Sequence, residues 1–267
     1  MSARARLALL VLACACGVAG AQPQAVVRMG VLASYGDAAD QQRLEVLGRY
    51  LGEALGDTRV EVVVLRMEAL DRAIQSRAID VVVTNASHYV VTAHRVGLSA
   101  PLASVVDVEA SRPLRGLGGA IVVRADRTDL GSLADLEYRR IATPGPWALA
   151  GYQAQALVLQ EAGLRLPEPD ELVITDGSHD DAVRAVLDGR ADAAFVLASV
   201  PPRMVRAGQL APDALRVLNR QDLPGYPYAL STPLYPNSPV VALPHLDEPL
   251  LRRLTSALLQ LPPTSPA

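Results

Sequence analysis

The chain repeats one pattern: RAIQSRAIDVVVTNAS at residues 72–87 returns as RAVLDGRADAAFVLAS at residues 184–199. In both copies an aspartate, Asp80 or Asp192, opens an apolar run that ends at an Ala-Ser pair. A fainter echo relates residues 26–35 to residues 139–152, each a strand, a loop and a tyrosine before a helix. Two halves built from one unit indicate two lobes that face each other across a cleft. Two ordinary βα units of a single sheet are the alternative.

Strand-like and helix-like patterns alternate along the rest of the chain. Four leucines between Leu44 and Leu55 recur at helical spacing, and Leu70 to Arg77 forms a second expected helix. The strand-like runs are nearly continuous Val and Ile, which is typical of parallel strands buried on both faces, so the predicted fold class is α/β. The expected strands are Val26–Leu32, Val60–Leu65, Val81–Thr84, Ala120–Arg124, Arg140–Thr143, Leu172–Thr175 and Ala193–Leu197.

The first residues have the form of an export signal. Arg4 and Arg6 precede an apolar run too short to cross a bilayer, and small residues up to Ala21 match the A-x-A cleavage pattern. We therefore expect residues 1–21 to be a signal peptide that is cleaved after Ala21, and the mature protein to be periplasmic. A lipoprotein attached through Cys14 or Cys16 is the alternative.

Composition excludes several classes of function. Both cysteines lie in the expected signal, so the mature chain would have no disulfide and no thiolate metal site. The net charge is −3 at pH 7, which gives no reason to expect nucleic acid or an anionic membrane as a partner. The chain lacks H-E-x-x-H, G-x-S-x-G, a Walker loop and paired-histidine metal spacing. We expect a binding protein without a cofactor or a metal, and no enzyme.

Four loops are predicted to lie beyond the carboxyl ends of strands, where ligands of open α/β sheets bind and helix N-termini present unpaired N–H groups. Each combines a small or hydroxyl residue with a tyrosine or a histidine. Neutral hydroxyl, amide and N–H donors can all point at oxygen, which indicates a small oxyanion as the ligand. The loops are Ser34-Tyr35-Gly36, residues 84–89, residues 147–152 and Ser178-His179-Asp180.

Several of these residues also have a purely structural interpretation. Ser178 opens an S-x-x-D capping pattern and is expected to cap a helix, which does not prevent it from contacting a ligand. Tyr89 follows a strand and fits a core position equally well. Gly151 opens a helix and is compatible with close packing alone. The glycine-rich run at residues 116–119 lacks the spacing of a phosphate loop and is interpreted as a crossover bend.

The loops and their order resemble the phosphate, phosphite and phosphonate class of solute-binding proteins. They are closer still to the version of that domain found at the front of tetrathionate-type sensor histidine kinases. Together the matching stretches cover nearly the whole expected mature chain. They are Arg28–Leu32, Asp80–Tyr89, Gly151-Tyr152, Ser178–Asp192, Ser231–Pro236 and Leu243-Pro-His245.

The resemblance implies a type II periplasmic-binding fold that closes on its ligand as a monomer. Lobe one would comprise residues 22–123 and 222–267, lobe two would comprise residues 124–221, and the hinge would lie near Val123 and Asp222. The family's ligand contacts fall on Tyr35, Thr84, Asn85, Ser87, His88 and Tyr89 in lobe one, and on Gly151, Tyr152, Ser178, His179 and Asp180 in lobe two.

One departure concerns the ligand. Phosphonate binders that this chain resembles have serines and threonines before the Gly-Tyr pair, whereas residues 146–150 here contain no hydroxyl and include Trp147. This favours a larger, softer or less charged anion, such as a sulfur oxyanion.

Three functions follow from the resemblance, and each needs a different partner or chemistry. The expected partner is the membrane permease of an ABC importer, and the alternative is a sensor histidine kinase. No kinase segment follows residue 267, so we expect that the protein either acts alone or partners a separate membrane protein. An enzyme that uses His179 and Asp180 as an acid–base pair is the third class considered.

Overall fold

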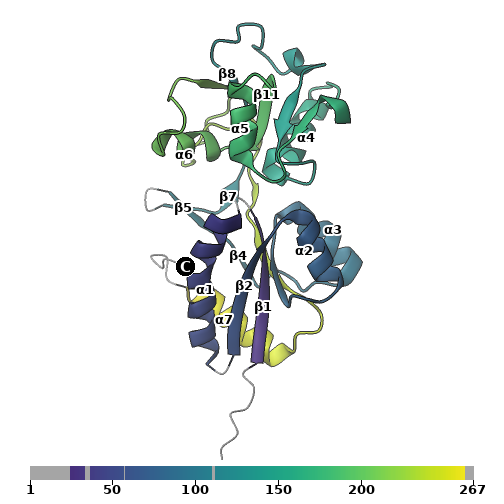
Figure 1. Ribbon diagram of the computed structural model, residues 1–267, viewed down its shortest axis with the longest axis vertical. Helices are drawn as coiled ribbons and strands as arrows, with labels where there is room; N and C mark the ends of the chain where they lie inside the picture. Colours follow the sequence, from purple (N-terminus) through teal and green to yellow (C-terminus); the bar gives the residue numbers. More distant parts are fainter. Residues whose placement is uncertain (1–24, 34–36, 57, 110–111, 262–267) are drawn as a thin grey trace, which may run out of the picture.

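The computed structural model describes residues 25–33, 37–56, 58–109 and 112–261, and only the backbone of residues 37–40, 42 and 43. Its strands form two five-stranded sheets, each in a lobe of its own, and the two lobes are stacked end to end (Figure 1). The protein is therefore α/β with two lobes, as the sequence repeat predicts.

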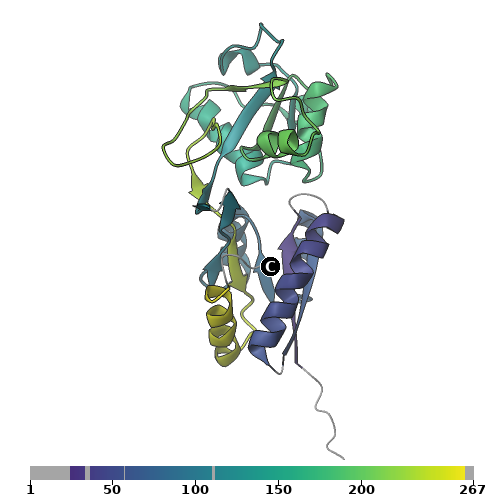
Figure 2. The same cartoon turned by 90° about the vertical axis from the view of Figure 1, so that its left-hand side faces the viewer.

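The first lobe has helices on both faces of its sheet. Helices α1 and α7 pack against one face through a buried cluster that includes Leu51 and Leu254, and α2 and α3 cover the other face (Figures 1 and 2). The strands, in sheet order, are β2 (Thr58–Leu65), β1 (Ala25–Leu32), β3 (Val81–Val83), β14 (Pro239–Ala242) and β4 (Ala103–Ser104). The helices are α1 (Asp37–Leu55), α2 (Met67–Gln75), α3 (Ala86–Val96) and α7 (Glu248–Leu259).

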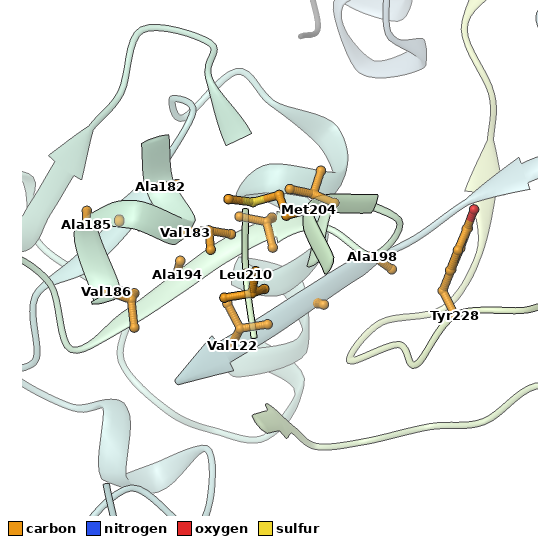
Figure 3. Close-up of a cluster of buried hydrophobic side chains, with 14 of the residues drawn as sticks. Val122, Ala182, Val183, Ala185, Val186, Ala194, Ala198, Met204, Leu210 and Tyr228 are labelled. Atoms are coloured by element: carbon orange, nitrogen blue, oxygen red, sulfur yellow. The ribbon is translucent and has the colours of Figure 1, made fainter. Parts of the chain in front are cut away.

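The second lobe repeats this arrangement. Side chains of α5 and α6, Val183 and Met204 among them, pack on Val122 of the sheet (Figure 3), and α4 packs on the opposite face. The strands, in sheet order, are β10 (Leu172–Ile174), β9 (Ile141–Thr143), β11 (Ala193–Leu197), β8 (Gly119–Arg124) and β12 (Leu215–Leu218). The helices are α4 (Gln153–Glu161), α5 (His179–Leu187) and α6 (Val200–Arg206), with 3₁₀ turns at Ala134–Leu136, Leu149–Gly151 and Pro169–Glu171.

The sequence repeat corresponds to a repeat in hydrogen bonding. The carboxylate of Asp80 accepts the backbone N–H of Arg28 at 2.7 Å, and the carboxylate of Asp192 accepts the backbone N–H of Arg140 at 3.0 Å. Each aspartate thereby ties the start of the third strand of its lobe to the neighbouring parallel strand. The two copies lie in different sheets, so the alternative of two βα units in a single sheet is wrong.

Strand direction differs from the expectation of parallel strands. β8 runs antiparallel to β11, and β14 runs antiparallel to β3. Both strands lie inside their sheets and are almost wholly buried, so their sequences are as apolar as those of the parallel strands. Burial on both faces therefore predicts a central strand but does not encode its direction.

The chain crosses between the lobes at residues that differ from those expected. Val123 lies inside β8, and the stretch after Asp222 still bridges back to the second lobe at Leu230. The two crossovers meet where β7 (Gly116–Leu117) pairs with β13 (Tyr235–Pro236), and β7 lies between the lobes in Figure 1. The interpretation of residues 116–119 as a crossover bend agrees with this position.

A short hairpin near this ribbon touches the second lobe. It consists of β5 (Asp107–Glu109) and β6 (Arg112–Leu114). The Glu109 carboxylate pairs with Arg206 of α6 at 3.1 Å and accepts the hydroxyl of Tyr228 at 2.6 Å. Burial and the neighbouring Glu109 carboxylate raise the pKa of Tyr228 above its ordinary value. The hairpin is thus a second contact between the lobes.

Candidate functional site

A small cavity lies between the lobes, where the amino ends of α2 and α5 meet. Its volume is about 40 Å³. A larger hollow of about 540 Å³ lies on the outer edge of the first lobe, between α1 and β2, away from the predicted ligand loops. The interlobe cavity is the better candidate because both lobes contribute to it. It is lined by Ala33, Arg66 and Met67 from the first lobe and by Trp147, Asp176, Gly177 and Ser178 from the second.

Asn85 begins α3 and reaches across to the second lobe. Its side-chain oxygen accepts the backbone N–H of His88 at 2.9 Å and the hydroxyl of Ser87 at 2.8 Å, which caps the helix. Its amide nitrogen donates to the backbone carbonyl of Trp147 at 3.4 Å. One side chain therefore fixes the start of α3 and contacts the facing loop.

The rings of His88 and Tyr89 are used inside the first lobe. Nδ1 of His88 lies 2.8 Å from the hydroxyl of the buried Thr84, and Nε2 lies 3.1 Å from the Asp71 carboxylate. The His88 side chain is only 9% exposed. Tyr89 packs in the core cluster below α3 and donates its hydroxyl to the carbonyl of Ser99 at 3.2 Å. These contacts orient the amino end of α3.

On the second lobe, Ser178 caps α5 as its sequence pattern predicts. Its hydroxyl oxygen accepts the N–H of Asp181 at 3.1 Å. His179 is the first residue of the helix, and its Nδ1 accepts the backbone N–H of Leu197 at 3.1 Å. Burial lowers the pKa of His179 to about 4, so the ring is neutral at pH 7. Because Nδ1 accepts, the proton of the neutral ring is on Nε2.

Asp180 and Gly151 are held by contacts within the second lobe. Asp180 forms an ion pair with Arg203 of α6, which compensates its charge. A Cβ atom at Gly151 would lie 2.8 Å from Cε1 of His179 and 3.0 Å from the ring of Pro144. Glycine is therefore required there by close packing, and its backbone seats the histidine ring.

Two of the three tyrosines of the predicted site, Tyr89 and Tyr152, are described by the structure, and neither lines the cavity. Tyr152 packs in the core of the second lobe, its ring centroid 6.3 Å from that of Phe195, and burial raises the pKa of its hydroxyl. Tyr35 lies outside the described residues. The structure thus places Asn85 against Trp147 and Ser178 at the cavity, whereas Tyr89 and Tyr152 pack, half-buried, against the cores of their lobes.

Arg66 is the basic member of the cavity residues that sequence reasoning missed, which also include Ala33, Met67, Asp176 and Gly177. It precedes α2 and is the one basic side chain lining the cavity among the described residues. The repeat contained the signal that could have found it. Asp80 and Asp192 lie 112 positions apart, and the same offset relates Arg66 to Ser178.

Two further classes of site are absent from the described part of the chain. No group of three or more histidine, cysteine or acidic side chains is placed to hold a metal ion there. No helix within those ranges is both long and apolar enough to cross a membrane.

Comparison with known proteins identifies the family. The family described as ABC transporter, phosphonate, periplasmic substrate-binding protein matches residues 29–266. The chain belongs to this family. Its members are substrate-binding proteins rather than enzymes, and the family indicates a periplasmic location.

Solved structures that resemble this phosphonate-type binding protein have the same fold. PhnD1 from Prochlorococcus marinus, in complex with methylphosphonate, is 17% identical with a TM-score of 0.69, over 90% of this chain and 85% of that one. A binding protein component of an ABC phosphonate transporter from Pseudomonas aeruginosa is 15% identical with a TM-score of 0.68, over 87% of this chain and 73% of that one. The likeness confirms the type II periplasmic-binding fold.

A curated relative connects the same domain to signalling. The tetrathionate sensor histidine kinase TtrS of Salmonella typhimurium is 27% identical over 240 residues, which cover 88% of this chain. The matched region spans only 39% of the kinase's length. The phosphonate-type chain therefore corresponds to one part of that larger protein.

Proposed function

We propose that the protein captures a small oxyanion in the interlobe cavity and delivers it to the membrane permease of an ABC importer. The observation that carries this proposal is the meeting of two helix N-termini, α2 from one lobe and α5 from the other, at a single cavity. Each N-terminus has partial positive charge and unpaired N–H groups. An anion between them contacts both lobes only when the lobes are closed, and this stabilises the closed state.

The proposed donors are one charged group and two neutral ones. The Arg66 guanidinium supplies the charge, and the Ser178 hydroxyl can donate its proton because its oxygen accepts from Asp181. Nε2–H of the neutral His179 ring is the third donor. Arg66 lies outside the four predicted loops, whose donors are neutral groups and histidines.

The ligand is to be sought with a thermal-shift screen of four anions: methylphosphonate, inorganic phosphate, thiosulfate and tetrathionate. A ligand that binds only the folded protein stabilises it and so raises its melting temperature. At a ligand concentration of 100 Kd the added free energy of unfolding is about 2.7 kcal/mol. Potassium chloride at equal ionic strength is the control. If none of the four anions raises the melting temperature above that control, the proposed capture of these oxyanions is contradicted.

Replacing Arg66 with Gln tests the position of the site. A lost hydrogen bond to a charged group costs about 1.5–3 kcal/mol, so the affinity for the best anion of the screen should fall roughly ten- to a hundredfold by calorimetry. Arg72→Gln is the matched control, since it removes the same charge from an exposed position on the same helix. Equal affinities of the two variants would place the ligand elsewhere.

A sensory role is the second candidate, because the kinase relative aligns with most of this chain. In that role the closed lobes would report the anion to a histidine kinase. A strain that lacks the gene separates the two functions. Lost uptake of the radiolabelled anion supports import, and normal uptake with lost anion-dependent transcription supports sensing.

We also propose export by a signal peptide that is cleaved after Ala21. Mass spectrometry of the protein from a periplasmic extract is expected to give the mass of a chain whose first residue is Gln22. A lipidated chain that begins at Cys14 or Cys16 would contradict this expectation.

A further inference from the structure

The single tryptophan of the chain lies between the lobes. Trp147 belongs to the second lobe, yet it packs against an apolar cluster of the first lobe that includes Leu32, Met67 and Leu70. Its backbone carbonyl accepts the interlobe hydrogen bond from Asn85 at 3.4 Å. Trp147 therefore makes both an apolar and a polar contact across the cleft.

Two glycines of the second lobe form the seat of the indole ring. A Cβ atom at Gly145 would lie 2.6 Å from the indole Nε1, and one at Gly177 would lie 3.7 Å from Cη2. Both glycines have positive φ, 153° and 94°, where a side chain would strain the backbone. The backbone of the second lobe thus reaches the ring directly and presents it to the first lobe.

We propose that Trp147 is a positioning residue that holds the second lobe against the first before a ligand binds. This rests on the proposed function, in which the anion occupies the cavity that Trp147 lines. A small anion offers little apolar surface, so the indole supplies the apolar part of the interlobe contact in advance. The apparent affinity of the ligand rises with the fraction of protein already in the binding-competent state.

The same contact limits the size of the ligand. With the indole docked, the remaining cavity is about 40 Å³. The sequence alone favoured a larger, softer or less charged anion because of Trp147, and the docked ring forms one wall of this cavity. An anion larger than the cavity has to displace the indole and loses the contact that it makes.

Small-angle X-ray scattering of the ligand-free protein tests whether Trp147 holds the two lobes together. Trp147→Ala is expected to give a larger radius of gyration than wild type, because the closed fraction falls. Trp147→Phe keeps an aromatic ring and is expected to stay near wild type. Tyr138→Ala is the matched control, since Tyr138 is an exposed ring of the same lobe that packs on Arg165 away from the cleft. A radius for Trp147→Ala equal to those of wild type and the control would overturn the proposal.

Fluorescence of the wild-type protein tests the same contact without a truncated ring. Because Trp147 is the single tryptophan, all indole emission reports on it. Acrylamide is expected to quench this emission severalfold less than that of free tryptophan amide. Met67→Gln, which alters the docking surface, is expected to raise the quenching constant. Quenching of the wild type as efficient as that of the free amide would show an exposed ring and overturn the proposal.

Calorimetry distinguishes an indole ring that favours the closed lobes from one that competes with the ligand for the cavity. For the anion of the four-member screen that binds the wild type, Trp147→Ala is expected to weaken binding about tenfold, as a tenfold lower competent fraction requires. Tighter binding by Trp147→Ala would show that the ring competes with the ligand. It would overturn the proposal that Trp147 holds the lobes together for binding. Failure of every anion to bind would contradict the proposed function. The scattering and quenching tests need no ligand, so they would still decide whether Trp147 holds the lobes together.

Discussion

The two lobes have the same strand order, and equivalent residues of their repeated segments lie at a constant offset in the sequence. The lobes nevertheless present different side chains to the cleft. Helix α2 begins after Arg66 without a side-chain cap, whereas the equivalent helix α5 begins after Ser178, whose hydroxyl caps it. The first residue is Met67 in one helix and His179 in the other. The shared backbone brings two helix N-termini to the cavity, and the side chains differ there. Comparing the lobes therefore separates what the backbone repeat supplies from what single residues supply.

The largest expected difference between the lobes is their response to acid. His179 stays neutral in the folded protein down to about pH 4, whereas the unfolded chain takes up this proton near pH 6.5. Since the unfolded state binds more protons in this window, stability falls as the pH falls from 6.5 to 4, by about 3 kcal/mol at most. Met67 cannot contribute such a loss.

His179→Gln tests this because glutamine can still accept the N–H of Leu197 but does not titrate. The free energy of unfolding, measured with urea between pH 7 and pH 4, should fall less for His179→Gln than for wild type. His94→Gln, at an exposed position, is the control and should follow the wild type. Parallel curves for all three proteins would contradict the role of His179.

The two lobes also differ in how one residue of β1 or β9 packs against the residue just before the repeated aspartate, Asp80 or Asp192. A Cβ atom at Gly30 would lie 2.6 Å from Cδ1 of Ile79, whereas the second lobe has Ala142 and Ala191 at the equivalent positions. Gly30→Ala is expected to cost about 1–3 kcal/mol through overpacking. Gly52→Ala is the control, because its Cβ atom would make an ordinary contact.

The double variant Gly30→Ala, Ile79→Ala gives the first lobe the packing of the second. Its loss of stability in urea unfolding should be smaller than the sum of the two single losses, by about 0.5–3 kcal/mol. Additive losses would show that the two sites do not compensate one another.

Capping distinguishes α5 from α2. Ser178→Ala removes a hydroxyl that accepts the N–H of Asp181, so the free energy of unfolding should fall by about 0.5–2 kcal/mol. Arg66→Ala removes no helix cap, and the free energy of unfolding should fall less than for Ser178→Ala. Chemical denaturation of both variants without ligand checks this order. A greater loss for Arg66→Ala would show that Arg66 has a structural role that Ser178 lacks.

The smallest expected effect concerns the residue that follows each helix. Arg77 has φ of 54° after α2, and Gly189 has φ of 71° after α5. Only glycine adopts this conformation without strain, so Arg77→Gly should stabilise the protein by about 0.5–1 kcal/mol. Gly189→Ala should destabilise it by a similar amount. Melting temperatures of the two variants that move in the same direction would contradict the equivalence of these turns.

Much of the fold was predictable because local patterns report burial and helix ends. The repeat identified two lobes, the leucine spacing identified the buried face of α1, and the S-x-x-D pattern identified the cap at Ser178. The direction of β8 was not predictable, since a strand inside a sheet is apolar whichever way it runs. The crossovers were misplaced for the same reason, because β8 resembles a strand of either lobe.

The candidate site was less predictable, because a residue type does not say where its side chain points. Tyrosine and histidine suit both a ligand and a core, and the structure uses Tyr89, Tyr152 and His88 inside the lobes. Arg66 was not predicted as a ligand residue, since an arginine before a helix is usually a solvated surface residue. Only the meeting of two lobes places it at the cavity.

The sequence by itself determined the α/β class, the two-fold repeat, and helix N-termini after the strands of both halves, since periodicity and capping act between neighbours in the chain. Tertiary structure alone decided which N-termini face one another, that Trp147 crosses to the other lobe, and how small the remaining cavity is. The physical reason is that these features depend on contacts between residues far apart in sequence. Such contacts are set by how the lobes pack, and no local pattern records them.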